Sequence, residues 1–147
     1  MPVRYTSRFY ISWLTSAILM YGGFVVWHGV FLNDLNHITF SKPLFFILTA
    51  FVYLVISYVL YRTYETRILE KFFYSDILKG VIVGFIIGFI LFALIAVLGI
   101  SFTKHVNSTY LLADCVWQIA EQIIGGLVIG FGKLFIFEPH PDMELAD

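Results

Sequence analysis

The sequence predicts an all-α integral membrane protein in which four transmembrane helices form a compact bundle, and two observations carry that prediction. First, 60% of the 147 residues are apolar and 13% are charged, whereas soluble domains carry about a quarter charged residues. Second, the charged residues are concentrated in short segments between long apolar runs. The chain therefore lacks the polar surface of a soluble domain, and the lipid of a bilayer has to act as its solvent.

Four apolar runs have the length that a helix needs to cross the hydrocarbon core, about 20 residues at 1.5 Å per residue. The first run is longer than the apolar core of a signal peptide, about 7 to 15 residues, so we interpret it as a mature helix. The tail 138–147 is expected to be solvated, because it holds two prolines and four acids. The whole chain is predicted to be one membrane domain, with spans at residues 9–31, 43–61, 77–101 and 111–137.

The charged segment 62–76, between the second and third runs, alternates charges with apolar residues. At helical spacing its apolar residues lie on one side, which predicts a short helix lying on the membrane surface. A simple extension of the second helix explains the same residues, and both interpretations stay open. The apolar residues are Ile68, Leu69, Phe72 and Phe73.

Lysine and arginine set the predicted orientation, because cytoplasmic loops retain them. If the N-terminus is inside, cytoplasmic segments hold seven of these residues and outer loops hold two, Lys42 and Lys104. Both termini are therefore predicted to be cytoplasmic, in a plasma membrane or a bacterial inner membrane. The inner set is Arg4, Arg8, Arg62, Arg67, Lys71, Lys79 and Lys133. Aromatic residues expected near the outer boundary are Trp27, Phe45 and Trp117.

Glycines recur on two predicted helices at an interval that suits close helix packing. Gly80, Gly84 and Gly88 form a GxxxGxxxG spacing, or glycine zipper, and Gly126 and Gly130 repeat the interval. A ridge without side chains lets another backbone approach and gain dispersion contacts, which is how helices associate in lipid. The ridge suits packing within the chain and contact with a second copy equally well. A homo-oligomer or a larger membrane complex is therefore expected alongside a tight bundle.

The fourth run carries a stripe of polar and small residues. Asp114, Gln118, Glu121, Gly125 and Gly132 follow at intervals of four, three, four and seven, which keeps them within about 60° around a helix. Glu121 is expected roughly 5 Å from the middle of its span. A carboxylate at that depth is costly unless it is protonated or faces the bundle interior, a cavity or a partner.

Two interpretations of this stripe remain open. In the functional one, Glu121 titrates or binds a cation on a polar path for an ion, proton or small solute, and Asp114 forms the outer entrance. Gln118 and Gln122 then line the path or hydrogen-bond Glu121. In the structural one, Glu121 is a neutral acid that holds the bundle together through a hydrogen bond. Its candidate partners are Gln118, Ser16 and Tyr53.

Two other classes of function are weighed against a polar path. One is a non-catalytic accessory, scaffold or immunity-type subunit that docks on another membrane protein. The other is a transition-metal site on the outer face, because imidazoles and carboxylates ligate such metals. The spacing gives that site little support, since the chain has no HxxxH or HExxH motif. Its candidate ligands are His28, Asp34, His37 and His105, together with Asp114 at the outer end of the fourth run.

Composition and motifs disfavour the remaining classes. The formal net charge is −1 and no polybasic block is present, so nucleic acid is not an expected partner, and membrane lipids are. No nucleophile elbow, phosphate-binding loop or haem-attachment motif occurs. An enzyme is therefore the least supported class, and no cofactor is predicted apart from the metal considered above.

Overall fold

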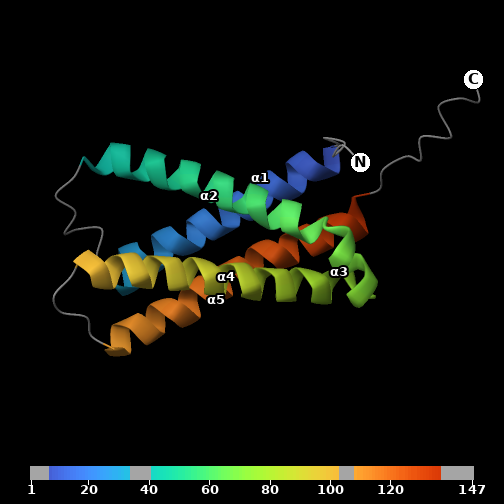
Figure 1. The fold of residues 1–147 in the computed structure, drawn as a ribbon. Helices are drawn as coiled ribbons and strands as arrows, with labels where there is room; N and C mark the ends of the chain where they lie inside the picture. The colour runs from blue at the N-terminus through green and yellow to red at the C-terminus, as the bar shows by residue number, and fades with distance from the viewer. Residues whose placement is uncertain (1–6, 34–40, 103–107, 137–147) are drawn as a thin grey trace, which may run out of the picture.

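The computed structural model is helical throughout the long segments that it describes, within residues 7–33, 41–102 and 108–136 (Figure 1). This confirms the prediction of an all-helical chain, and four of its helical stretches are long and apolar enough to cross a membrane. They are Ser7–Phe31, Lys42–Tyr64, Asp76–Val97 and Leu111–Phe135. The elements are α1 (Ser7–Val26), η1 (Trp27–Phe31), α2 (Lys42–Tyr64), α3 (Arg67–Phe72), α4 (Asp76–Phe102) and α5 (Ser108–Phe135).

Large apolar side chains are exposed along all four long helices. Examples, one from each helix, are Ile18, Ile47, Phe89 and Phe131. In the most apolar stretch of each helix, between 22% and 28% of the residues are buried, so most of the apolar surface faces outward. Because soluble monomers rarely expose apolar patches of this extent, the four helices indicate an integral membrane protein.

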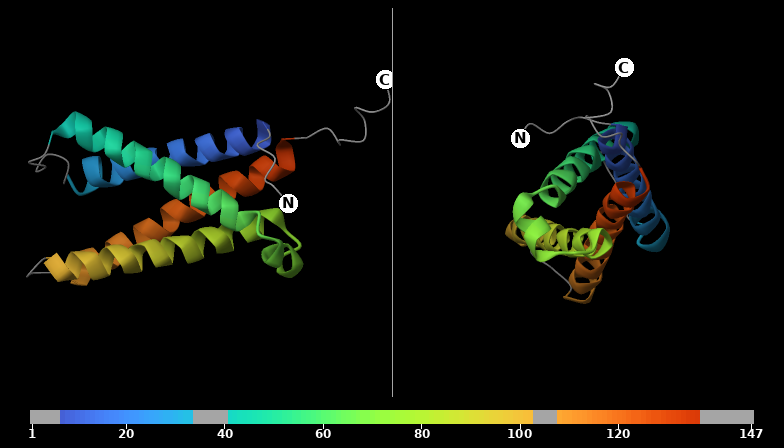
Figure 2. Two further views of the ribbon diagram at one scale, coloured as in Figure 1. Left: turned by 45° about the horizontal axis from the view of Figure 1, so that its top comes forward. Right: turned by 90° about the vertical axis from the view of Figure 1, so that its right-hand side faces the viewer.

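The four long helices run back and forth, so the bundle has two ends (Figures 1 and 2). The α3 end holds α3, the start of α1 and the end of α5, and the η1 end holds η1 and the start of α2. α4 packs along α5, and α1 packs against both α5 and α2. α2 lies close to α4 at the α3 end and separates from it towards the η1 end (Figure 2).

Glycines bring the backbones of α4 and α5 into contact. A Cβ atom added at Gly80 would collide with the carbonyl oxygen of Gly126, and one added at Gly84 would collide with that of Gln122. Gly88, one turn further along α4, faces α5 in the same way. Of the two arrangements that suit the ridge, packing within the chain is therefore the one found here. The glycines that take part are Gly80, Gly84, Gly88, Gly126 and Gly130.

Short hydrogen bonds join α1 to its two neighbours. The indole N–H of Trp13 donates to the carbonyl of Leu54 at 2.8 Å, and the hydroxyl of Ser57 donates back to the carbonyl of Trp13 at 2.8 Å. On the other side of α1, the hydroxyl of Ser16 donates to the carbonyl of Gly125 at 3.2 Å. In lipid no water competes for these groups. The hydrogen bonds therefore fix how α1 is rotated about its own axis relative to α2 and α5.

The segment 62–76 combines features of both predicted forms. α2 continues to Tyr64, and α3 is a separate helix of six residues. Ile68 and Phe72 on α3 are exposed, whereas Leu69 packs against the buried core. The position of α3 at a membrane surface stays a prediction, and the exposed pair is consistent with it.

The end of α1 differs from a regular helix. Residues Trp27–Phe31 form a π-helical turn, in which the backbone N–H of Leu32 donates to the carbonyl of Trp27 at 2.9 Å. Asn33 follows with a φ of 57°, a left-handed conformation that asparagine tolerates better than most residues. This turn was not expected from the sequence, and it contributes Trp27 and His28 to the cavity described below.

We predict that Gly84→Ala destabilises the protein by about 1 to 3 kcal/mol, because the new methyl group forces apart two backbones in contact. Gly22→Ala is the matched control: a Cβ atom there meets nothing within 4 Å, and the exchange favours the helix by about 1 kcal/mol. Unfolding in mixed micelles, followed by circular dichroism, measures both. Equal stability of the two variants would contradict the close α4–α5 contact.

Candidate functional site

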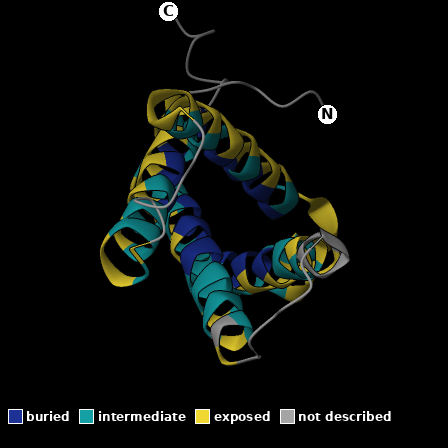
Figure 3. Cartoon of the chain, turned by 90° about the vertical axis from the view of Figure 1, so that its left-hand side faces the viewer, coloured by how far each residue is buried: buried dark blue, intermediate teal, exposed yellow. Residues whose placement is uncertain are grey.

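A cavity of about 550 Å³ lies between the four long helices at the η1 end. Figure 3 looks at this end, where buried positions line the inner faces of the helices. The volume falls in the range of cavities that hold small molecules, roughly 300 to 1,000 Å³. The wall is mostly apolar, with a few polar side chains from η1, α2 and α5. These polar side chains include His28, Thr49, Tyr53, Asp114 and Gln118.

Asp114 is held at the cavity wall by a pair of tryptophans. The rings of Trp27 and Trp117 are stacked, with centroids 4.6 Å apart and planes 7° apart. The indole N–H of Trp27 donates to Oδ1 of Asp114 at 3.3 Å, while the buried indole nitrogen of Trp117 has no hydrogen-bond partner among the described residues. Because Trp27 opens the π-helical turn, the irregular end of α1 contributes directly to this wall.

Glu121 lies behind the cavity, inside the bundle, and is 2% exposed. The hydroxyl of Tyr53, which lines the cavity, donates to Oε2 of Glu121 at 3.0 Å. Of the three partners considered from the sequence, Tyr53 is the one whose hydrogen bond to this carboxyl group is present. The other oxygen, Oε1, has no side-chain donor among the described residues. The carboxyl group also faces the backbone of α1, where Phe24 is a hydrogen-bond partner and a Cβ added at Gly23 would lie 3.6 Å from Oε1.

The two glutamines of the predicted site face different neighbours. Gln118 lines the cavity beside Asp114. Gln122 is fully buried and packs against α4, where a Cβ atom added at Gly88 would lie 3.2 Å from its own Cβ. Neither amide atom of Gln122 has a hydrogen-bond partner in the described structure. The structure thus brings Asp114, Gln118 and Glu121 to one region and turns Gln122 towards α4.

The predicted metal ligands are only partly placed. His28 and Asp114 line the same cavity. Asp34, His37 and His105 lie outside the described residues. Within the described ranges, no three histidine, cysteine or acidic side chains come together as a metal site would require.

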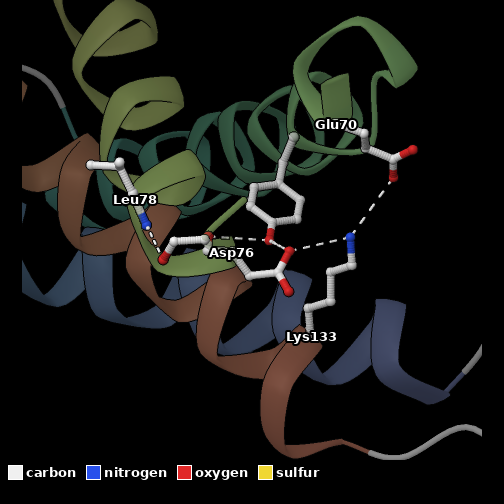
Figure 4. A network of polar contacts seen from close by, with 6 residues as sticks. Glu70, Asp76, Leu78 and Lys133 are labelled. Atoms are coloured by element: carbon white, nitrogen blue, oxygen red, sulfur yellow. Dashed lines mark hydrogen bonds and ion pairs between the residues drawn. The ribbon is translucent and has the colours of Figure 1, made fainter. Parts of the chain in front are cut away.

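A second polar cluster closes the α3 end, and its members come from four helices (Figure 4). Oδ1 of Asp76 accepts a hydrogen bond from the hydroxyl of Tyr64 at 2.9 Å and lies 3.3 Å from Nζ of Lys133. Lys133 also approaches Glu70, at 3.8 Å. Lys79 is 1% exposed, and its Nζ lies 4.4 Å from the centre of the Tyr64 ring. The cluster therefore joins α2, α3, α4 and α5 at one point.

The aromatic wall of the cavity was not predicted as part of a site. Trp27, Phe45 and Trp117 were expected only as residues near a membrane boundary, and all three line the cavity. The signal in the sequence was their clustering near the predicted outer ends of three spans, although it does not say which rings face inward.

No known protein family, curated protein or solved structure matches the chain, so the function has to be inferred from the site.

We predict that Tyr53→Phe destabilises the protein by about 1 to 3 kcal/mol, because it leaves a buried carboxyl oxygen without its donor. Tyr58→Phe, on the exposed side of the same helix, is expected to change stability by less than about 0.5 kcal/mol. Unfolding in mixed micelles, followed by circular dichroism, compares the stabilities of the two variants. A double-mutant cycle with Glu121→Leu, whose side chain cannot accept a hydrogen bond, then isolates the pair, and a coupling energy of zero would show that the hydrogen bond does not form.

We predict that Asp76→Asn destabilises the protein by about 1 to 3 kcal/mol, because Tyr64 and Lys133 both use its carboxylate. Glu70→Gln serves as the control, since its longer ion pair is half-exposed and such pairs contribute at most about 1 kcal/mol. The same unfolding measurement compares the two variants, and an equal loss in both would mean that Asp76 does not organise the α3 end.

Proposed function

We propose that the chain is a small multi-pass membrane protein that binds a small solute in the η1-end cavity and handles a proton or cation through the carboxylates of α5. The observation that carries the proposal is the buried carboxyl group of Glu121, bonded to Tyr53 in the wall of a cavity lined by all four long helices. Ionisable groups within spans face bundle interiors or water-filled cavities and mark ion or solute pathways.

The bonding of Glu121 supports this role over a purely structural one. Tyr53 is the side-chain donor of this carboxyl group, and it bonds Oε2. Buried polar atoms in native proteins are nearly always hydrogen-bonded, yet Oε1 has no side-chain donor among the described residues, so it provides a place for a proton or for a bound cation. Asp114 and Gln118 lie on the same side of α5, within the cavity wall, and provide an entrance to it.

Buried hydroxyl groups extend the polar face beyond Glu121 towards the α3 end. Ser16 and Ser12 on α1 are buried, and they contact α5 at Gly125 and Gly132. The hydroxyl of Ser16 bonds the carbonyl of Gly125, and that of Ser12 has no partner among the described residues. In this proposal the hydroxyls continue the route of a proton along α5.

The proposed orientation puts the α3 end in the cytoplasm of a plasma membrane or bacterial inner membrane. The basic residues of the described chain lie at that end, apart from Lys42 at the start of α2, and cytoplasmic segments retain such residues. The cavity then belongs to the outer half of the bilayer.

A second copy or another membrane protein would have to dock on a surface other than the glycine ridge between α4 and α5.

We predict that Glu121→Gln lowers proton or monovalent cation flux at least tenfold in liposomes that contain the purified protein. A pH-sensitive dye inside the liposomes reports proton entry under an imposed potassium diffusion potential, and a sodium-sensitive dye reports sodium entry. Glutamine has nearly the same shape as glutamate, so we expect the variant to fold. Its unfolding midpoint, compared with that of the wild type, checks this. Glu70→Gln at the α3 end is the acidic control and is expected to keep wild-type flux.

Unchanged flux in Glu121→Gln, or wild-type flux no higher than in empty liposomes, would contradict the proposal. In the second case, a stoichiometric partner that co-purifies after mild solubilisation would support the accessory-subunit class instead. Metal bound to the purified protein, and lost in His28→Ala, would support the metal-binding class.

A further inference from the structure

We infer that the ligand of the η1-end cavity is a lipophilic organic cation, which enters sideways from the lipid between α2 and α4. This inference rests on the proposed function and names the class of its solute. Three properties of the wall support it: the sign of its charge, its aromatic surface and the position of its opening.

The charge around the cavity is negative. Among its lining residues, Asp114 is the one with a formal charge at neutral pH when His28 is neutral, and no lysine or arginine lines it. Charges interact strongly in a low-dielectric environment, so a cation in this cavity is favoured over an anion of the same size.

The wall is also rich in aromatic rings. Six of its seventeen residues are aromatic, and they come from all four long helices. The faces of such rings attract organic cations, and quaternary ammonium groups are commonly recognised in this way. The Trp27–Trp117 stack lies directly beside Asp114, so aromatic and carboxylate groups act on the same volume. The six residues are Phe24, Trp27, Phe45, Tyr53, Phe92 and Trp117.

We place the opening of the cavity at the side of the bundle, because wall residues on two neighbouring helices are exposed there. α2 and α4 separate towards the η1 end (Figures 1 and 2), and both contribute wall residues that are exposed. These are Leu48 and Val52 on α2 and Ile95 on α4. In a bilayer these apolar side chains face acyl chains, so a molecule that arrives by this route must itself dissolve in lipid. The carboxylate of Asp114 then requires that it carry positive charge.

Two ions of the same shape and opposite charge test the inference. Tetraphenylphosphonium is the cation and tetraphenylborate the anion, and equilibrium dialysis against protein in nanodiscs measures binding of each, with empty nanodiscs as the background. We expect the cation to bind at least tenfold more tightly. Asp114→Asn is expected to lower its affinity at least fivefold, while Glu70→Gln at the opposite end leaves the affinity unchanged.

Blocking variants locate the binding site. Ala96→Trp fills the cavity from α4 and is expected to abolish binding of the cation, whereas Leu94→Trp places the same ring on the exposed side of that helix and leaves binding intact. Thr49→Trp fills the cavity from α2 and provides a second blocking variant if the first does not fold. The inference is overturned if the blocking variant that folds binds the cation normally, or if the cation binds no better than the anion.

The outcomes separate this inference from the proposed function. If both ions bind equally and both are lost in Ala96→Trp, the cavity binds a solute but does not select cations, so the inference fails and the proposed solute site stands. If the cation binds selectively but Glu121→Gln leaves flux unchanged, the inference stands and the proposed role of Glu121 fails. Absence of binding for both ions overturns the inference, and the flux measurement still decides the function.

Discussion

The backbone contact between α4 and α5 is the constraint on which the rest of the bundle depends. Because one side of α5 lies directly on the glycines of α4, its opposite side must face α1 and α2. That side carries Glu121, whose carboxyl group consequently meets Tyr53 of α2 and Gly23 of α1. A larger residue at the helix contact would turn or displace α5, and with it the carboxyl group. The depth and surroundings of the candidate site thus follow from residues that take no part in it.

Buried polar groups have different surroundings at the two ends of the bundle. At the α3 end, the carboxylate of Asp76 on α4 binds both Tyr64 of α2 and Lys133 of α5, which joins three helices at one point. Buried polar atoms without a hydrogen-bond partner among the described residues occur towards both ends: Nζ of Lys79 at the α3 end lies over the ring of Tyr64, and the indole nitrogen of Trp117 belongs to the cavity wall. Since unmade hydrogen bonds in a low-dielectric interior are costly, the indole nitrogen of Trp117 is a group that a molecule in the cavity can satisfy.

The long elements could be predicted from the sequence because span length and apolar content are local properties. The glycine interval likewise predicted a close contact, but its partner depended on how the helices assemble. The same limit applied to Glu121: three side chains could reach it, and only the rotation of α1 and α2 made Tyr53 the donor. The cavity depends on the divergence of α2 from α4, which no local pattern encodes. The π-helical turn Trp27–Phe31 ends its helix, so no further helical residues follow whose shifted periodicity would reveal it.

The π-helical turn also has an evolutionary consequence. Such a turn accommodates one more residue than an α-helical turn and is common at functional sites. Loss of one residue from Trp27–Phe31 would restore a regular helix and re-aim Trp27, while α4 and α5 would keep their contact. Related chains could therefore acquire differently shaped cavities through single-residue insertions and deletions at this helix end. In an alignment, a gap at this position would then mark a change in the shape of the cavity even where every wall residue is identical.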